Sequence, residues 1–322
     1  MTDPTTSRAA GKAPHRATAI LLQVVKWVLF AAVLVFAGRE IHLRSARVDW
    51  DTLRFDITLM VLAALSILAA KALTFLMYGL LLRRFGASPG WLPVMASVWT
   101  AQIAKYVPGK VGSVVGIVLA LRRFGVAGQT ALGAIIMVDG ASVALGLAVT
   151  IPLSLWAPVH ERFPTVWLWC TLALAASLVC LHPRILAAAA NPILRRAGYQ
   201  PVTIPFRYRD YLGPVLVQVL PCGFLGLGCW LLAGSMKPVP ASALPIVCCA
   251  VVTVTIAGFL AFFAPAGLGV QESLLLVLLS PLIGGGLAAI VAVLMRLFQV
   301  LAEALLAAAG LVMVWRLAPR PQ

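Results

Sequence analysis

Two short stretches decide the fold of this chain: KYVPGKVG at residues 105–112 and FFAPAGLG at residues 262–269. When Pro108 is set against Pro265, an aromatic residue, the proline, a small residue, an aliphatic residue and a glycine fall into register. Both stretches lie inside long apolar segments, where proline and glycine end helices. Interrupted apolar segments at matching places in two halves of a chain indicate a binding site of the transporter type.

The composition predicts an integral membrane protein. Hydrophobic residues make up 62% of the 322 residues and charged residues 11%, which is too little polar surface to cover a soluble globule. The formal net charge is +15. The basic residues gather in tails and loops between apolar runs, which indicates contact with anionic lipid head groups and not with nucleic acid. The six cysteines lie in apolar runs without ligand spacing, and we interpret them as small buried hydrophobic residues.

About 20 apolar residues are needed to cross the hydrocarbon of a bilayer, and this length divides the chain into spans. Residues 1–19 are polar and basic and predict a disordered cytoplasmic tail. Unbroken spans are expected at residues 20–37, 57–82, 130–151, 165–181, 212–233 and 287–314. The first of these lacks a good cleavage site, so we favour a retained helix over a secretory signal. The regions 91–121 and 243–283 each consist of two shorter apolar pieces. The proline and glycine residues of the motif separate the two pieces, and we call them the breaker.

Loop charges orient these spans. Arginines at 83–84, 122–123 and within 181–210 lie on one side, which the positive-inside rule assigns to the cytoplasm together with both termini. The first broken region then begins and ends at the cytoplasmic face, and the second at the outer face. We therefore predict two re-entrant hairpins that enter from opposite faces. Eight full crossings would place the charged loops on the same sides of the membrane. This alternative is left open, because the piece at 243–263 is long enough to span.

The predicted fold is an all-α polytopic membrane protein with about six transmembrane helices plus two re-entrant helical hairpins, or eight spans. Residues 20–316 form one transmembrane domain of two inverted repeats, at about 20–151 and 165–316, and residues 317–322 form a cytoplasmic tail. Non-helical backbone inside a bilayer must be satisfied by protein or water. Both breakers are therefore expected to line an enclosed or wet cavity, with simple kinks between packed helices as the alternative.

Ionisable residues within the apolar segments define a candidate site. They are Lys71, Lys105, Lys110, Asp139, Glu272, Arg296 and Glu303. Each costs about 2.5–3.5 kcal/mol at the centre of a bilayer, so each needs a partner or water. Structural pairing of Asp139 with Lys71, or of Glu303 with Arg296, is the alternative to a binding role. Four positive and three negative charges suit a zwitterionic or phosphate-bearing head group.

The two motifs resemble those of the membrane region of lysylphosphatidylglycerol synthases and of related stand-alone, flippase-like bacterial proteins. The resemblance covers about residues 20–314. The later motif of that family usually reads PGGLGVRE, whereas here Ala266 replaces a glycine and Gln271 replaces the arginine. The missing arginine weakens a phosphate-binding role at this position, although Arg296 or Lys110 could serve instead.

The resemblance implies a lipid translocase of the bacterial cytoplasmic membrane, whose cargo is a phospholipid or a lipid of a polyprenyl or hopanoid pathway. The chain ends directly after its last span, so we expect it to lack the soluble aminoacyltransferase domain. It also carries no catalytic signature, and we do not expect an enzyme. The alternative is a non-transporting scaffold for a glycosyltransferase or another lipid-modifying enzyme.

In the leading hypothesis Lys105 and Lys110 attract phosphate, and Glu272 binds an amine or a sugar hydroxyl or anchors the hairpin tip. Arg296 and Glu303 line the far wall. The expected substrate-binding residues are Lys105, Tyr106, Pro108, Gly109, Lys110, Asp139, Pro265, Gly267, Gly269, Gln271, Glu272, Arg296 and Glu303. The expected partners are membrane lipids with an anionic or phosphate-bearing head group. No cofactor or metal is expected, and a homodimer is left open.

Overall fold

The structure is a computed structural model, and it describes residues 55–106, 111–196, 212–261 and 264–317 and the single positions 35 and 39. Within these residues the regular structure is entirely helical, without a strand. The helical segments long and apolar enough to cross a membrane are Ile57–Arg84, Gly128–Leu155, Gly213–Gly234, Ala241–Leu260 and Gly285–Leu317. The prediction of an all-α polytopic membrane protein is therefore confirmed. The predicted tail at 1–19, the first helix at 20–37 apart from position 35, and residues 318–322 lie outside the described residues.

The first half of the described chain contains a broken span, an interrupted hairpin and a long helix. Its elements are α2 (Ile57–Leu73), α3 (Phe75–Arg84), α4 (Trp91–Thr100), η2 (Ile103–Tyr106), α5 (Val111–Arg122), α6 (Gly128–Leu155), α7 (Ala157–His160), α8 (Val166–Cys180) and α9 (Pro183–Arg196). Asp56 caps α2, because its carboxylate accepts the N–H of Leu59 at 3.2 Å. Thr74 separates α2 from α3 and donates its hydroxyl to the carbonyl of Lys71 at 2.8 Å. The predicted span at 57–82 therefore has a break about two-thirds of the way along it.

The second half repeats this order of elements. Its elements are α10 (Leu212–Val217), α11 (Val219–Gly234), η4 (Ala241–Ala243), α12 (Leu244–Leu260), η5 (Pro265–Gly267), α13 (Val270–Ile283) and α14 (Gly285–Leu317). The predicted span at 212–233 is made of α10 and α11, and the span at 287–314 is α14. Gly284 joins α13 to α14 with φ 85°, a left-handed value that glycine adopts without a side-chain clash.

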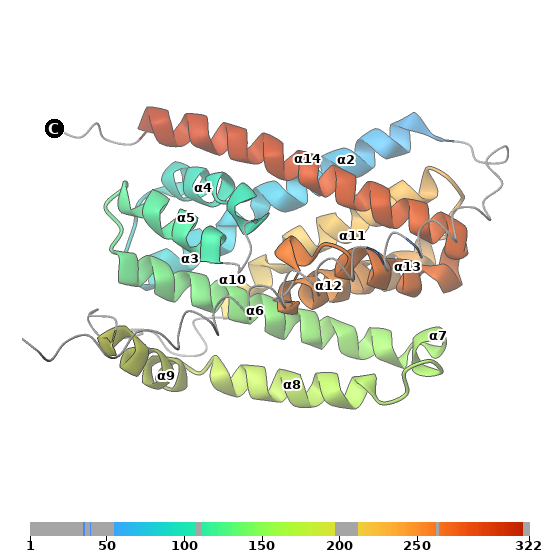
Figure 1. The fold of residues 1–322 in the computed structure, drawn as a ribbon, viewed down its shortest axis with the longest axis horizontal. Helices are drawn as coiled ribbons and strands as arrows, with labels where there is room; N and C mark the ends of the chain where they lie inside the picture. The colour runs from blue at the N-terminus through green and yellow to red at the C-terminus, as the bar shows by residue number, and fades with distance from the viewer. Residues whose placement is uncertain are drawn as a thin grey trace, which may run out of the picture.

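Each interrupted motif lies at the turn of a helical hairpin. In the first hairpin α4 packs against α5, and in the second α12 packs against α13. Figure 1 shows α4 and α5 toward the left end of the long axis and α12 and α13 toward the right, while α14 runs along both. The two turns face each other, because η2 contacts η5. The two hairpin turns are therefore in contact through η2 and η5, although residues 107–110 lie outside the described residues.

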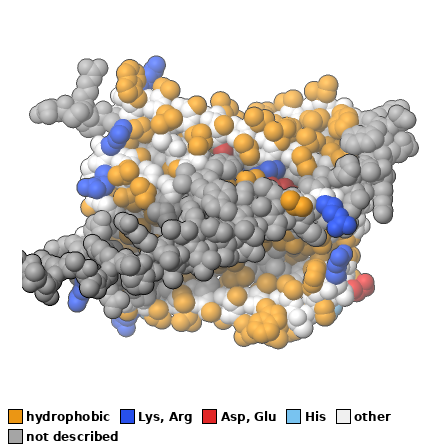
Figure 2. Space-filling view, in the orientation of Figure 1, with side chains coloured by type: hydrophobic (Ala, Val, Ile, Leu, Met, Phe, Trp, Pro, Cys, Tyr) orange, Lys and Arg blue, Asp and Glu red, His pale blue; other side chains and the backbone are white. Residues whose placement is uncertain are grey.

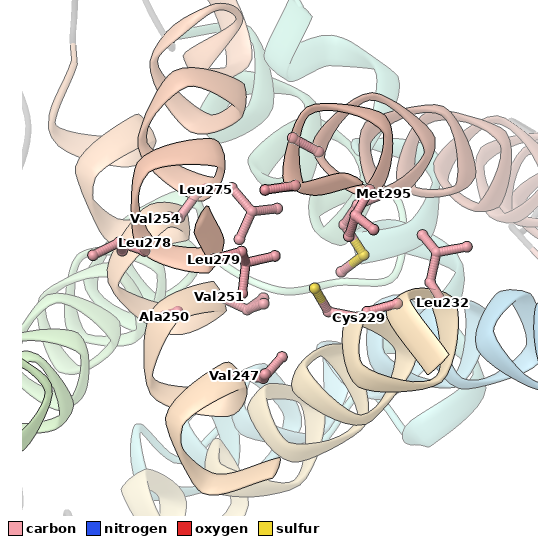
Figure 3. Packing of buried hydrophobic residues seen from close by; sticks show 14 of the residues in the cluster. Cys229, Leu232, Val247, Ala250, Val251, Val254, Leu275, Leu278, Leu279 and Met295 are labelled. Atoms are coloured by element: carbon pink, nitrogen blue, oxygen red, sulfur yellow. The ribbon is translucent and has the colours of Figure 1, made fainter. Parts of the chain in front are cut away.

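Two clusters of buried apolar side chains hold these halves together. One lies mainly among α2, α11, α12, α13 and α14, and the other among α3, α4, α5 and α6. Figure 3 shows the first cluster, in which Leu279 of α13, Val251 of α12 and Met295 of α14 face one another. Each cluster contains the helices of one hairpin, so each hairpin packs on its own core.

The outer surface is apolar as well. Large hydrophobic side chains such as Leu65, Trp169 and Leu305 are more than half exposed, and orange side chains cover much of the visible face in Figure 2. Lys and Arg lie mainly toward the two ends of that face, with a few charged groups near its middle. This distribution suits a protein surrounded by lipid. All six cysteines are free. The prediction that they are buried is confirmed for Cys229 and wrong for Cys180, which is exposed, while the other four are half-buried.

Candidate functional site

The last helix carries the polar residues around which the candidate site is built. Arg296, Gln299 and Glu303 follow one another at intervals of three and four residues, which places them on one face of α14. All three fall in the middle third of this 33-residue helix. Charged groups so far from both ends of a membrane-length helix require polar partners.

Glu303 binds two lysines that come from the other half of the chain. Its Oε1 lies 2.8 Å from Nζ of Lys71 and 2.5 Å from Nζ of Lys105. Glu303 is fully buried, whereas the side chains of Lys71 and Lys105 keep 14% and 27% of their surface exposed. Lys71 lies in the last turn of α2 and Lys105 in η2. One carboxylate therefore ties α2, the first hairpin turn and α14 together.

Arg296 binds the second hairpin turn through three contacts. Its Nη1 donates to Oε1 of Gln271 at 3.2 Å, and its Nη2 donates to the carbonyl of Ala266 at 3.1 Å. Its Nε lies 3.3 Å from Oε1 of Glu272, which is a salt bridge without hydrogen-bond geometry. The guanidinium thus holds the tip of the hairpin and the first turn of α13 against α14.

The backbone of this turn requires small residues. Ala266, Gly267 and Gly269 have φ values of 50°, 71° and 83°, all in the left-handed region. A Cβ on Gly267 would lie 2.7 Å from the Cα of Gly258 on α12, so only a glycine fits there. The chain can therefore turn tightly enough for α12 and α13 to pack side by side.

Glu272 caps the N-terminus of α13. Its Oε2 accepts the backbone N–H of Gly269 at 2.6 Å, which satisfies a donor that the helix itself leaves unpaired. The same side chain is 8% exposed and faces Arg296 through its other oxygen. The geometry matches one of the three roles predicted for Glu272, that of an anchor for the hairpin tip.

A narrow pocket lies beside these residues, between α12, α13 and α14. Its polar lining residues are Thr255, Gln271, Glu272, Arg296 and Gln299. Its apolar lining residues are Val251, Val254, Leu275, Ala292 and Met295. The pocket therefore offers both hydrogen-bonding groups and aliphatic surface, in a space with room for about one water molecule.

The charges of the described site residues do not cancel. Lys71, Lys105 and Arg296 supply three positive charges, and Glu272 and Glu303 supply two negative ones, which leaves a formal surplus of one positive charge. The surplus lies with the two lysines around Glu303, since Arg296 and Glu272 balance each other. An anionic group is therefore favoured next to Lys71 and Lys105.

Most of the predicted site residues come together. Lys105, Gln271, Glu272, Arg296 and Glu303 contact one another or line the pocket. The residues Pro265, Gly267 and Gly269 form the backbone of the second turn, and Tyr106 ends η2. Pro108, Gly109 and Lys110 lie outside the described residues.

Two pairings that the sequence left open are replaced by others. Lys71 forms its salt bridge with Glu303 and not with Asp139, and Arg296 forms its salt bridge with Glu272. Asp139 takes no part in these salt bridges. It lies on α6, which packs against α3, α5, α8 and α12. The physical reason is that α14 contacts α2, α4 and α13, which brings the charges of α14 to those elements.

Sequence reasoning missed part of the site. Lys71 is one of the ionisable residues of the apolar segments but is absent from the expected substrate-binding residues, and Gln299 and Thr255 are in neither set. Gln299 carries no charge, so it does not stand out in an apolar helix. The available signal was its spacing, because Gln299 lies three residues after Arg296 and four before Glu303.

A family model that covers most of the chain matches this sequence. It is described as the lysylphosphatidylglycerol synthase TM region, and the match extends over residues 23–307. This range contains both hairpins and all five charged residues of the site. No curated protein gives a significant match.

Proposed function

The chain belongs to the lysylphosphatidylglycerol synthase transmembrane-region family, and we propose that it is a translocase that moves a phosphate-bearing lipid between the leaflets of a membrane. The single observation that carries this proposal is the charged site where the two hairpin turns meet. Lys105 of the first turn and Arg296 beside the second turn both belong to that site. A polar head group that crosses a bilayer needs such polar groups near the midplane.

We propose that both hairpins are re-entrant and enter from opposite faces. The helices α4, α5 and α13 have 10, 12 and 14 residues, so they rise about 15, 18 and 21 Å. These lengths are short of the hydrocarbon thickness of about 30 Å. The segment Ala241–Leu260 is long enough to cross, but its return through the shorter α13 and the contact of η5 with η2 favour a turn inside the membrane.

The same arrangement supports an orientation in a bacterial inner membrane. The last turns of α3, α5 and α14 carry Arg84, Arg122 and Arg316, and these helix ends lie at the left of Figure 1. Under the positive-inside rule this end faces the cytoplasm together with both termini. The head group is then loaded from one end of the long axis and released at the other.

Transport requires the site to open. The pocket is narrow, and Glu303 holds Lys71 and Lys105 in direct contact. We propose that the phosphate of the lipid replaces Glu303 as the partner of these lysines while α14 moves relative to α2 and η2. The positive surplus of the site stabilises the phosphate during this exchange. No bond is made or broken in the lipid, so the proposal needs neither a catalytic group nor a cofactor.

Exchange of labelled lipid between leaflets tests the proposal. The purified protein is reconstituted into liposomes with fluorescent phosphatidylglycerol, and a membrane-impermeant reductant bleaches the label in the outer leaflet. Protein-containing vesicles should lose the protected fluorescence faster than protein-free vesicles. Lys105→Gln should slow this loss at least fivefold, because it removes a cation of the site.

Lys237→Gln is the matched control, since Lys237 is exposed after α11 and far along the chain from the site residues. It should leave the exchange rate unchanged. Equal exchange in vesicles with and without folded protein, for phosphatidylglycerol and for a polyprenyl phosphosugar, would contradict transport. If an inactive protein were also purified with a bound glycosyltransferase, the scaffold alternative would be supported instead.

A further inference from the structure

We infer that Trp99 is a positioning residue for Lys71. Its indole binds the carbonyl of Ala72 and so fixes the end of α2, from which Lys71 reaches Glu303. The first hairpin then sets the place of both lysines of the site, Lys105 directly and Lys71 through the backbone of another helix. The part that Lys71 plays in transport rests on the proposed function, whereas its placement can be measured without transport.

The end of α2 presents backbone carbonyls that side chains bind. Thr74 interrupts the span between α2 and α3. The hydroxyl of Thr74 donates to the carbonyl of Lys71 at 2.8 Å, and Nε1 of Trp99 donates to the carbonyl of Ala72 at 3.0 Å. A carbonyl at a helix end requires a partner from outside the helix, and inside a bilayer its absence is costly. Trp99 therefore stabilises the interruption in the place where Lys71 begins its reach.

Trp99 is in turn held by α14. It lies on α4, which packs against α14. At this contact a Cβ on Gly310 of α14 would lie 2.6 Å from the backbone nitrogen of Thr100 and 2.9 Å from the Cβ of Trp99. The two helices therefore approach as closely as a glycine allows. Since α14 also carries Glu303, the indole that orients Lys71 and the carboxylate that binds it are fixed on the same helix pair.

A second contact joins the same two elements. Nε2 of Gln102 donates to the hydroxyl oxygen of Thr74 at 3.4 Å, and Thr74 passes this contact on to the carbonyl of Lys71. Gln102 lies between α4 and η2, three residues before Lys105. The segment from Trp99 to Lys105 therefore touches the end of α2 at two points and itself carries the second lysine.

The placement matters because both lysines contact one oxygen. Nζ of Lys71 and Nζ of Lys105 both lie against Oε1 of Glu303. A lysine ammonium sits on a flexible four-carbon stem, so it keeps to a single oxygen only if its backbone is fixed. If Lys71 moves away, Glu303 pairs with Lys105 alone, and the two cations no longer act on an anion at one point.

The chemical reactivity of the lysines tests this inference. Trp99→Phe keeps an aromatic ring and removes the N–H donor. The intact purified protein in detergent is treated with trace acetic anhydride, and mass spectrometry of its peptides compares each lysine with the exposed Lys237. Lys71 should react about threefold faster or more in the variant, the change expected from the loss of one hydrogen bond. Lys105 should react at the same rate or more slowly, because Glu303 then serves it alone.

A matched control lies on the same helix. Trp91→Phe makes the same substitution at a ring that packs on Gly79 of α3 and stacks on Arg83 at 4.2 Å, and it should leave the rates of both lysines unchanged. Thr74→Val removes the hydroxyl at nearly constant size. It should raise the rate of Lys71 selectively, and it provides the test if the tryptophan variant does not fold.

Two results would overturn the inference. One is a wild-type rate at Lys71 in both Trp99→Phe and Thr74→Val. The other is an equal acceleration at Lys71 and Lys105, which would show a general loosening of the structure. Trp99→Phe should also slow lipid exchange by about threefold. Selective acceleration at Lys71 in a protein that exchanges no lipid would support the positioning role and contradict only the translocase proposal.

Discussion

The substitution Glu303→Gln isolates the salt bridges that join the two halves of the chain. It keeps the size of the side chain and removes its charge. Lys71 and Lys105, at 2.8 and 2.5 Å from the carboxylate, then lose their shared counterion. Two ammonium groups near the middle of the protein remain without a charge partner at Glu303.

The expected cost follows from the burial of the three side chains. Removing one partner of a buried ion pair costs about 3–5 kcal/mol. Glu303 is fully buried, but Lys71 and Lys105 keep 14% and 27% of their side-chain surface, so water reaches part of both lysines. We therefore expect the lower end of this range, about 3 kcal/mol of the free energy of unfolding.

Two further variants separate the charge effect from a packing effect. The triple variant Lys71→Met, Lys105→Met and Glu303→Met removes every charge of this cluster with unbranched side chains. Replacing a buried ion cluster by apolar groups is often neutral or stabilising, so the triple variant should be within about 1 kcal/mol of the wild type. Glu161→Gln, at an exposed position after α7, should change the stability by less than about 0.5 kcal/mol.

The free energy of unfolding is measured by titration with sodium dodecyl sulfate in mixed micelles, followed by tryptophan fluorescence. The reasoning is refuted if Glu303→Gln is as stable as the wild type, or if the triple variant is as unstable as Glu303→Gln. The triple variant also has a functional readout. It should be folded yet inactive in lipid exchange, because it lacks the cations that we propose to receive the phosphate.

Three other substitutions test separate parts of the site. Gly267→Ala should destabilise the protein by about 1–3 kcal/mol in the same titration, since its backbone is left-handed and its Cβ would meet Gly258; wild-type stability would show that the turn can rearrange. Arg296→Lys should cost about 1–2 kcal/mol, because an ammonium cannot reach both acceptors of the guanidinium, and an unchanged titration would show that those hydrogen bonds contribute little. Asp139→Asn should leave lipid exchange within about twofold of the wild type, as Asp139 lies on α6 and the carboxylates that bind Lys71, Lys105 and Arg296 are Glu303 and Glu272, and a larger loss would extend the site to α6.

Much of the architecture could be predicted because it follows from local sequence. Proline and glycine at 265–269 lie between the end of α12 at Leu260 and the start of α13 at Val270, as the breaker pattern requires. The positions of α6, α8 and α14 follow from the length of their apolar runs. The break at Thr74 was not predicted, because the sequence there contains neither proline nor glycine.

The partners of the charges could not be predicted in the same way. Lys71 and Glu303 are separated by more than two hundred residues, and their contact depends on how α2 packs against α14. Sequence identifies which charges need partners but not which pairs form. Gln299 illustrates a second limit, since a neutral amide within an apolar helix is recognised only after its neighbours in space are known.

The carbonyl of Ala266 has a consequence for the order in which the protein is assembled. It accepts hydrogen bonds from Arg296 at 3.1 Å and from Gln271 at 3.4 Å, and the first of these donors lies on α14, which is synthesised after the hairpin. A backbone carbonyl without a strong partner inside a bilayer costs several kcal/mol. Under the proposed re-entrant arrangement, this carbonyl therefore has only the 3.4 Å hydrogen bond from Gln271 of the same hairpin until α14 enters the membrane beside it and supplies Arg296.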